Sequence, residues 1–344
     1  MLYTWTRRLP NLISRSWKRS RRPIRRKPVA RHKPAFEQLE DLTLLSTINW
    51  TGAANDNNWN STGNWDLGRL PTASDDALIG PAFSGMTITH SSSASDAVNS
   101  LNSRAAFSLT GGTLTISVSS TINGDLTLSA ALAGAGDLTV NGLTTWTSGT
   151  MSGTGHTIAD GGVSLSGALP KTLIARSLDN FGTAVWSGSG IVGSIILSNG
   201  AVWNNEPGSV FDYQLDVSAS INNGGGITPP QFNNAGLLLK SASTGTMAVG
   251  VALNNTGTVQ VSTGTVNLSG GGTSSGTFSV GSILIFSGGT FTMQSGAAFT
   301  GAGSVQVPTF GALNVAGNVS LPNLVLNGGT LTGTGNVSVT NALN

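Results

Sequence analysis

The stretch Leu253-Asn-Asn-Thr-Gly-Thr-Val-Gln-Val261 decides the fold, because variants of it return along the chain. Each copy has an apolar residue, small residues or Asn, a shared Gly, and then alternating apolar and polar positions. The clearest further copies span 132–140, 151–158, 299–307 and 331–339, and a looser copy spans 232–239. One such unit cannot bury its apolar face alone, so this recurrence predicts a repeat protein with stacked units.

The runs that alternate with period two predict short strands with one buried and one wet face. Gly and Asn punctuate these runs, as turns with positive φ require. Several intervals between the shared glycines approximate one or two units of ~20 residues, the scale of one solenoid coil. We therefore predict an all-β fold, a right-handed parallel β-helix (β-solenoid), with about twelve coils after residue 100. The residues expected to point into its core include Val259, Val261, Val266, Leu268, Val305, Val307, Val337 and Val339, with Thr258, Gln260 and Gln306 outward.

Charge divides the chain of 344 residues into two unlike parts. Twelve of its 17 basic residues lie in the first 33 positions, where no acidic residue occurs. From residue 34 onward there are five basic and fifteen acidic residues. The prolines at 10, 23, 28 and 34 argue against one long helix, so residues 1–35 are expected to be a disordered basic tail.

Such a tail has four interpretations: a targeting segment, a nucleic-acid-binding arm, a segment that lies on an anionic membrane surface, or a solvated extension. A twin-arginine pair, Arg7 and Arg8, is present, yet no apolar run of signal-peptide length follows it. The residues after the tail favour targeting, and nucleic acid is not an expected partner.

Residues 36–46, Phe-Glu-Gln-Leu-Glu-Asp-Leu-Thr-Leu-Leu-Ser, resemble the N-terminal motif of planctomycete exported proteins of the LEPR-XLL type. Leu42 departs from that motif, which usually has Arg at this place. The resemblance implies a bacterial protein that is secreted or held at the cell surface. The alternative is a short helix that caps the solenoid. The matching residues, which form the expected targeting motif, are Phe36, Glu37, Leu39, Glu40, Asp41, Leu44, Leu45 and Ser46.

Residues 47–100 are rich in Trp and differ from the repeats that fill 101–344. Trp50, Trp59 and Trp65 lie within sixteen residues. This block resembles the opening module of autotransporter-like β-helix proteins, which implies a cap over the first coil. Large aromatic side chains can fill the open end of a solenoid core. The functional alternative is a sugar-binding platform, since Trp faces stack on sugars.

Residues suited to catalysis are few and scattered. Cys is absent, and the three His residues are far apart in sequence. Asp75 and Asp76 are the best carboxylate candidates, but neighbours on a strand point to opposite faces. Asp212 and Asp216, near Glu206, are a second group. We expect no catalytic residues, no enzyme activity and no cofactor, and we retain Asp75 and Asp76, together with the three Trp residues, as weak binding candidates.

Metal and membrane binding have equally little support. Residues 55–58, Asn-Asp-Asn-Asn, offer oxygen donors but too few carboxylates for an EF-hand loop. Asn205, Asn222 and Asn223, like the Asn pairs of the repeats, are expected to form stacks of side-chain amides inside turns. No apolar run reaches 18 residues, so no transmembrane helix is expected.

These observations predict a non-catalytic structural or adhesin-like repeat protein, secreted or at a bacterial cell surface. Its expected partners are polysaccharides and cell-envelope or matrix components, and self-association stays open. The alternatives are a carbohydrate-active enzyme (lyase or hydrolase) on the same β-helix, and a nucleic-acid binder that uses the basic tail.

Overall fold

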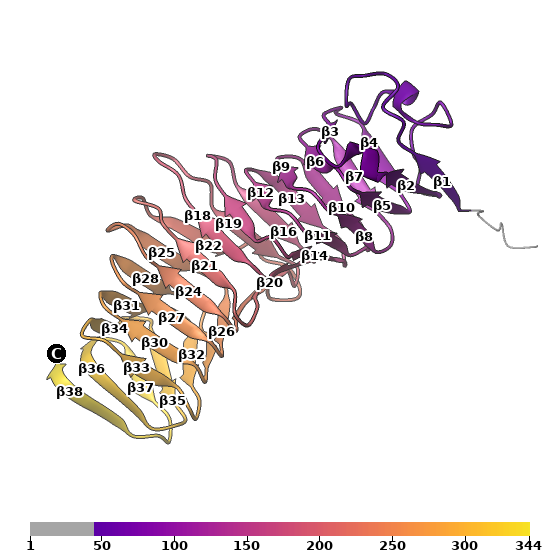
Figure 1. Cartoon of the computed structure of the whole chain (residues 1–344). Helices are drawn as coiled ribbons and strands as arrows, with labels where there is room; N and C mark the ends of the chain where they lie inside the picture. Colours follow the sequence, from indigo (N-terminus) through magenta and orange to yellow (C-terminus); the bar gives the residue numbers. More distant parts are fainter. Residues whose placement is uncertain (1–44) are drawn as a thin grey trace, which may run out of the picture. The chain divides into compact units, whose positions relative to one another are not determined.

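A computed structural model describes residues 45–344, and within that range the chain is a parallel β-solenoid of about 13 coils. The predicted all-β solenoid is thus confirmed. Figure 1 shows the coils following one another from indigo to yellow, each built from up to three strands. The tail (1–35) and residues 36–44 of the expected targeting motif lie outside the described residues.

Three parallel sheets, here called sheets 1, 2 and 3, form the sides of the solenoid. Sheet 1 contains β1 (Ser46–Asn49), β2 (Asp75–Ile79), β5 (Ser100–Ser103), β8 (Ser120–Ile122), β11 (Leu138–Val140), β14 (His156–Ala159), β17 (Ser177–Asn180), β20 (Val202–Asn205), β23 (Gln231–Asn234), β26 (Ala252–Asn255), β29 (Gly272–Ser274), β32 (Thr290–Met293), β35 (Ala312–Val315) and β37 (Thr330–Thr332). Sheet 2 contains β3 (Thr87–His90), β6 (Ala106–Leu109), β9 (Leu126–Leu128), β12 (Thr144–Trp146), β15 (Val163–Leu165), β18 (Thr183–Trp186), β21 (Val210–Tyr213), β24 (Leu237–Lys240), β27 (Thr258–Val261), β30 (Thr277–Val280) and β33 (Ala298–Thr300).

Sheet 3 completes each coil, so the chain visits the three sheets in a fixed order. It contains β4 (Ser95–Val98), β7 (Thr113–Ile116), β10 (Ala131–Ala133), β13 (Gly149–Ser152), β16 (Lys171–Ile174), β19 (Ile195–Ser198), β22 (Ala219–Asn223), β25 (Thr246–Val249), β28 (Thr265–Leu268), β31 (Ile283–Phe286), β34 (Ser304–Pro308), β36 (Val319–Asn327) and β38 (Val337–Leu343). Two short 3-10 helices, η1 (Thr62–Asn64) and η2 (Pro81–Phe83), lie in loops beside the first coils.

Alternating side chains form one continuous apolar core, as the period of two predicts. In β27, Val259 and Val261 are buried, whereas Thr258 and Gln260, which alternate with them, are partly exposed. The other predicted core residues up to Val307 are buried in the same way. Val337 and Val339 are only half-buried, because they lie in the last coil of the stack.

In the copy of the repeat phrase at 151–158, two glycines lie at the corner between β13 of sheet 3 and β14 of sheet 1. Gly153 has a φ of 98°, the left-handed region that the turn requires. Gly155, the shared Gly, needs no positive φ; a Cβ there would overlap the carbonyl oxygen of Gly136, one coil earlier. A Cβ on Gly153 would likewise overlap the carbonyl oxygen of Gly134, so both glycines of this corner are needed for close stacking of coils. Positive φ, which the sequence suggested, applies at this corner to the first Gly.

A buried ladder of side-chain amides, here called the inner ladder, runs through four coils at the inner face of sheet 1. Asn180 donates to Asn205 (3.0 Å), Asn205 to Asn234 (2.8 Å), Asn234 to Asn255 (2.7 Å), and Asn255 to the hydroxyl of Ser274 (3.0 Å). The nitrogens of Asn180, Asn205 and Asn234 also donate to backbone carbonyls, which fixes the orientation of those amides. The predicted amide stack at Asn205 is confirmed, although it lies at strand ends and not inside turns.

Candidate binding surface

The outer face of sheet 1 carries one in-register line of side chains, one from each of its fourteen strands. We call this line the outer row. It comprises Asn49, Leu78, Asn102, Thr121, Thr139, Ile158, Asp179, Asn204, Asn233, Asn254, Thr273, Thr292, Asn314 and Thr332. All but Leu78 and Ile158 are polar, and adjacent members are separated by the spacing of neighbouring strands, ~4.8 Å.

The middle of the outer row is joined by hydrogen bonds. Asn204 donates to Asp179 (2.6 Å), Asn233 to Asn204 (2.8 Å), Asn254 to Asn233 (2.9 Å), and the hydroxyl of Thr273 to Asn254 (3.2 Å). The three Asn side chains remain partly exposed. Asn204 and Asn233 therefore each keep a donor hydrogen and an acceptor lone pair for a partner outside the chain. Asn254 also donates to the Oε1 of Gln231 (3.1 Å), so its amide keeps only an acceptor lone pair.

Asp179 ends this chain of donors and also accepts from the Nδ1 of His156 at 2.7 Å. Beneath it, Arg176 is buried and donates to the hydroxyl of Thr157 and to the carbonyl oxygens of Gly134, Gly136 and His156. Burial lowers the pKa of Arg176 to about 10. Arg176 thus stabilises stacked corners and is closed to ligands.

A hollow of about 300 Å³ lies on the outer row near its N-terminal end. It is lined by Leu78, Asn102 and Thr121 of the row, and by Ser103, Arg104 and Asn123 beside it. We call it the Arg104 hollow. A second, wider hollow of about 560 Å³ lies over the stacked turns between sheets 1 and 2. Its lining is mostly small residues and backbone, including Gly208, Gly236 and Gly257.

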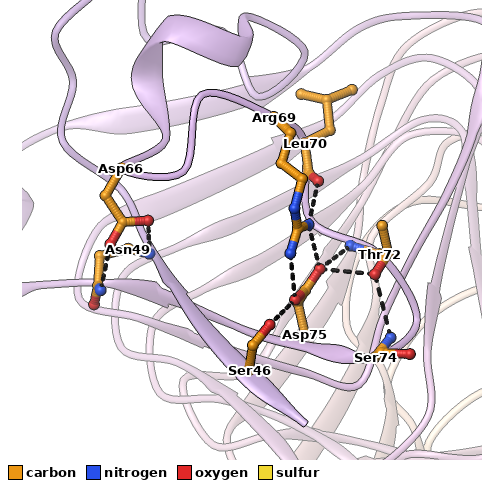
Figure 2. A network of polar contacts seen from close by, with 8 residues as sticks. All are labelled: Ser46, Asn49, Asp66, Arg69, Leu70, Thr72, Ser74 and Asp75. Carbon is orange, nitrogen blue, oxygen red and sulfur yellow. Dashed lines mark hydrogen bonds and ion pairs between the residues drawn. The ribbon is translucent and has the colours of Figure 1, made fainter. Parts of the chain in front are cut away.

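Asp75, one of the predicted binding candidates, is the centre of a structural network that Figure 2 shows. Its carboxylate accepts two bonds from Arg69 (2.6 and 2.9 Å), two from Thr72 (both 2.7 Å), and one from the hydroxyl of Ser46. Those bonds, that from Arg69 foremost, hold the pKa of Asp75 far below its usual range. All its acceptor positions are occupied by the protein, so Asp75 fastens β1 to β2.

Asp76 points to the other side of β2, as expected for neighbours on a strand. It accepts from the side chains of Asn99 (2.7 Å) and Ser100 (2.6 Å). Asp212, in β21, accepts from Gln214 (2.6 Å) and Ser241 (2.5 Å). The structure records no contact that would join Asp212 to Asp216 or Glu206 within the described residues, so these carboxylates are not brought together as an acid/base pair.

The three clustered Trp side chains are buried in the first coils. Trp65 packs edge-on against both Trp50 and Trp59, with ring centroids 5.1 and 4.8 Å apart, and its indole nitrogen donates to the carbonyl of Trp59. Trp59 also packs edge-on against Phe107. Because these rings are at most 3% exposed, no face is left on which a sugar could stack, and the sugar-platform interpretation is set aside.

Two lysines are buried in the core, which their residue type does not predict. Lys171 is buried and donates to the carbonyls of Gly167 (3.4 Å) and Leu169 (3.3 Å). Desolvation lowers its pKa to about 8. Lys240 is also buried, donates to the carbonyls of Ala242 and Ser243, and lies 5.1 Å from the ring centre of Tyr213. Both ammonium groups donate hydrogen bonds to backbone carbonyl oxygens at the corners of coils.

Metal-binding geometry is absent from residues 45–344: no three His, Asp or Glu side chains are arranged to hold an ion. In the loop at 55–58, the carboxylate of Asp56 already accepts from Ser61 (2.5 Å) and Asn64 (2.6 Å). His90 is buried between the carbonyl of Gly111 and the carboxylate of Asp96. Neither described helix is long and apolar enough to cross a membrane.

Comparisons with known proteins find no match to this chain among protein-family models, curated proteins or solved structures. The class that the fold defines is that of the parallel β-solenoids.

Proposed function

We propose that this chain is a non-catalytic structural or adhesive repeat protein, secreted or displayed at a bacterial cell surface, with the outer row as its contact surface. The observation that supports this role is the in-register line of polar side chains at one per coil. Each position offers one weak hydrogen-bonding site. Many such sites on one rigid sheet add up through multivalency.

A polysaccharide is the partner class that suits this surface best. From Asn204 to Thr332 the outer row consists of uncharged amides and hydroxyls. Such groups exchange hydrogen bonds with the hydroxyls of a glycan without the desolvation cost of a charge. Cell-envelope and matrix glycans therefore remain the expected partners.

Export is supported by the basic tail and by the resemblance of residues 36–46 to the LEPR-XLL motif. Cell fractionation with N-terminal sequencing of the native protein tests this part. We expect the protein in the envelope or medium, with its N-terminus close to Ser46. An intact tail on protein that is bound to the nucleoid would favour the nucleic-acid alternative and overturn the proposal.

The contact role is tested with a panel of polysaccharides, read both as binding and as release of reducing ends. Replacing Asn233 and Asn254 by Ala should weaken binding of a polysaccharide that the wild type retains. The matched control replaces Gln260 and Ser279 by Ala on the outer face of sheet 2, and binding should persist. Release of reducing ends that disappears on Asp75→Ala, Asp76→Ala or Asp212→Ala would favour the carbohydrate-active enzyme instead.

A further inference from the structure

The Arg104 hollow differs chemically from the rest of the outer row. Its lining combines two amides (Asn102 and Asn123), a hydroxyl (Thr121), an exposed apolar side chain (Leu78) and a guanidinium. Its volume of about 300 Å³ is at the lower end of the roughly 300–1,000 Å³ typical of small-ligand pockets. The space therefore suits a single small unit such as one sugar ring.

Arg104 is the exposed cation without an ionic partner in residues 45–344. Of the other four basic residues there, Arg69 pairs with Asp75, and Lys171, Arg176 and Lys240 are buried on backbone carbonyls. The side chain of Arg104 makes one long hydrogen bond, 3.4 Å, to the Oδ1 of Asn123. Most of its five donor hydrogens thus remain available.

The neighbouring side chains are held in place around this charge. Asn123 donates from Nδ2 to the carbonyl of Ser103 (3.0 Å), and its Oδ1 also accepts from Asn141 (3.0 Å). This arrangement turns the Oδ1 of Asn123 toward Arg104 and restrains one edge of the guanidinium. Asn102 and Thr121 belong to paired strands and present their polar groups from the same face.

We propose that the Arg104 hollow binds a sugar unit that carries one carboxylate. A guanidinium offers a planar fork that matches a carboxylate with two parallel hydrogen bonds. Asn102, Thr121 and Asn123 can exchange hydrogen bonds with ring hydroxyls, and Leu78 can cover the apolar C–H face of the ring. A single exposed positive charge without an ionic partner, on a body (residues 45–344) with twelve acidic and five basic residues, favours a monoanion over a phosphate or a polyanion.

This inference rests on the proposed contact role and deepens it, since the hollow lies on the same outer row. A mainly neutral glycan that lies along the row would place an acidic sugar at Arg104. The hollow thereby provides selectivity, whereas the uncharged amides and hydroxyls provide avidity.

The test is a ligand-observed NMR titration of the full chain with D-glucuronate at physiological salt. D-Glucose, inorganic phosphate and N-acetylaspartate are the comparison probes. We expect saturable binding of glucuronate that Arg104→Gln weakens about tenfold, the value of one charge-assisted hydrogen bond. Arg104→Lys should also weaken binding, because an ammonium lacks the fork. The basic tail is the same in every variant, so its nonspecific attraction cancels in the comparison.

Gln260→Ala, in the second hollow, is the matched control and should bind glucuronate like the wild type. Thermal unfolding of each variant checks the fold, and Arg104→Lys preserves the charge if Arg104→Gln is unstable. Absence of glucuronate binding, equal binding by wild type and both Arg104 variants, or equal binding of glucose would overturn the inference. Equal binding of phosphate or N-acetylaspartate would overturn its assignment to a sugar. If neutral polysaccharides still bind in the panel above, the proposed function stands while this inference fails.

Discussion

Asn204 and Asn205 are neighbours in β20, yet their side-chain amides donate in opposite directions along the solenoid. Asn204 donates from the outer face toward the N-terminal coils, to Asp179, and Asn205 donates from the inner face toward the C-terminal coils, to Asn234. The same opposition holds for Asn233 and Asn234 in β23. Two chains of amides therefore run through the same coils, one buried and one partly exposed.

The buried chain should contribute far more to stability than the exposed one. Asn234→Ala removes the donor to Asn255 and leaves a cavity, so we expect a loss of about 2–3 kcal/mol in the free energy of unfolding. Asn233→Ala, its neighbour on the outer face, should cost less than about 1 kcal/mol because water replaces the lost bonds. Denaturant unfolding of both variants measures the difference. Equal losses would contradict the assignment of inner and outer faces.

The inner ladder ends on an unpaired atom, and this end can be extended. The Oδ1 of Asn180 is buried without a donor, and Ala159 is its in-register neighbour one coil earlier. Ala159→Ser adds a hydroxyl that can donate to this oxygen, as Ser274 closes the other end, and should stabilise the protein by up to about 1 kcal/mol. Ala184→Ser, at an equally buried site outside the ladder, is the control and should destabilise it. If both substitutions changed stability in the same direction, the Oδ1 of Asn180 would already have a hydrogen-bond donor.

The register of β27 gives a direct test of the core. Val261→Asp places a charge in the core and should cost several kcal/mol. Gln260→Asp, one residue away on the outer face, should change stability by less than about 0.5 kcal/mol. Thermal unfolding of the two variants compares them, and similar effects would show that the two faces are misassigned.

Lys171 should make stability depend on pH in the alkaline range. Its pKa is about 8 in the folded chain, below the usual 10.5, so the unfolded chain binds more protons between these values. Stability of the wild type should therefore rise, relative to Lys171→Met, as the pH increases from 8 to 10.5. Urea unfolding of both proteins across that range measures the difference. A difference that stays constant would contradict a buried, desolvated ammonium.

Asp75 should act at the opposite end of the pH scale. Asp75→Asn breaks the paired hydrogen bonds to Arg69 and should lower the free energy of unfolding by about 2–3 kcal/mol at neutral pH. This loss is smaller than that for a fully buried ion pair, because Arg69 is partly exposed. The depressed pKa of Asp75 means that this contribution is present above 3.8 and is lost as the pH falls from there. Asp76→Asn is the control, with a smaller expected loss. Denaturant midpoints at pH 7 and near pH 3 compare the variants.

The alternation of apolar residues predicted the solenoid and its core because strand geometry alone sets a period of two. The outer row could not be read in this way. Successive members Asn204, Asn233 and Asn254 are 29 and 21 residues apart, so loops of unequal length hide the register. Only the pairing of strands aligns them.

The burial of three basic side chains was the other feature that the sequence did not predict. Lys171, Arg176 and Lys240 are expected at a surface by their residue type. Their burial depends on carbonyl oxygens that corners of particular shape turn toward them, for example those of Gly134 and Gly136 beneath Arg176. The positions of those oxygens are a property of stacked coils and leave no periodic signal in the sequence.

The shared glycines bear on how such a chain can change during evolution. Gly257 meets Gly236 one coil earlier, and Gly276 in turn meets Gly257, so each corner is matched to the corners of the adjacent coils. A coil duplicated together with its corner would find the same surroundings as its parent. Gene duplication can therefore lengthen the solenoid in steps of one coil, and every step adds one more contact position without redesigning the rest.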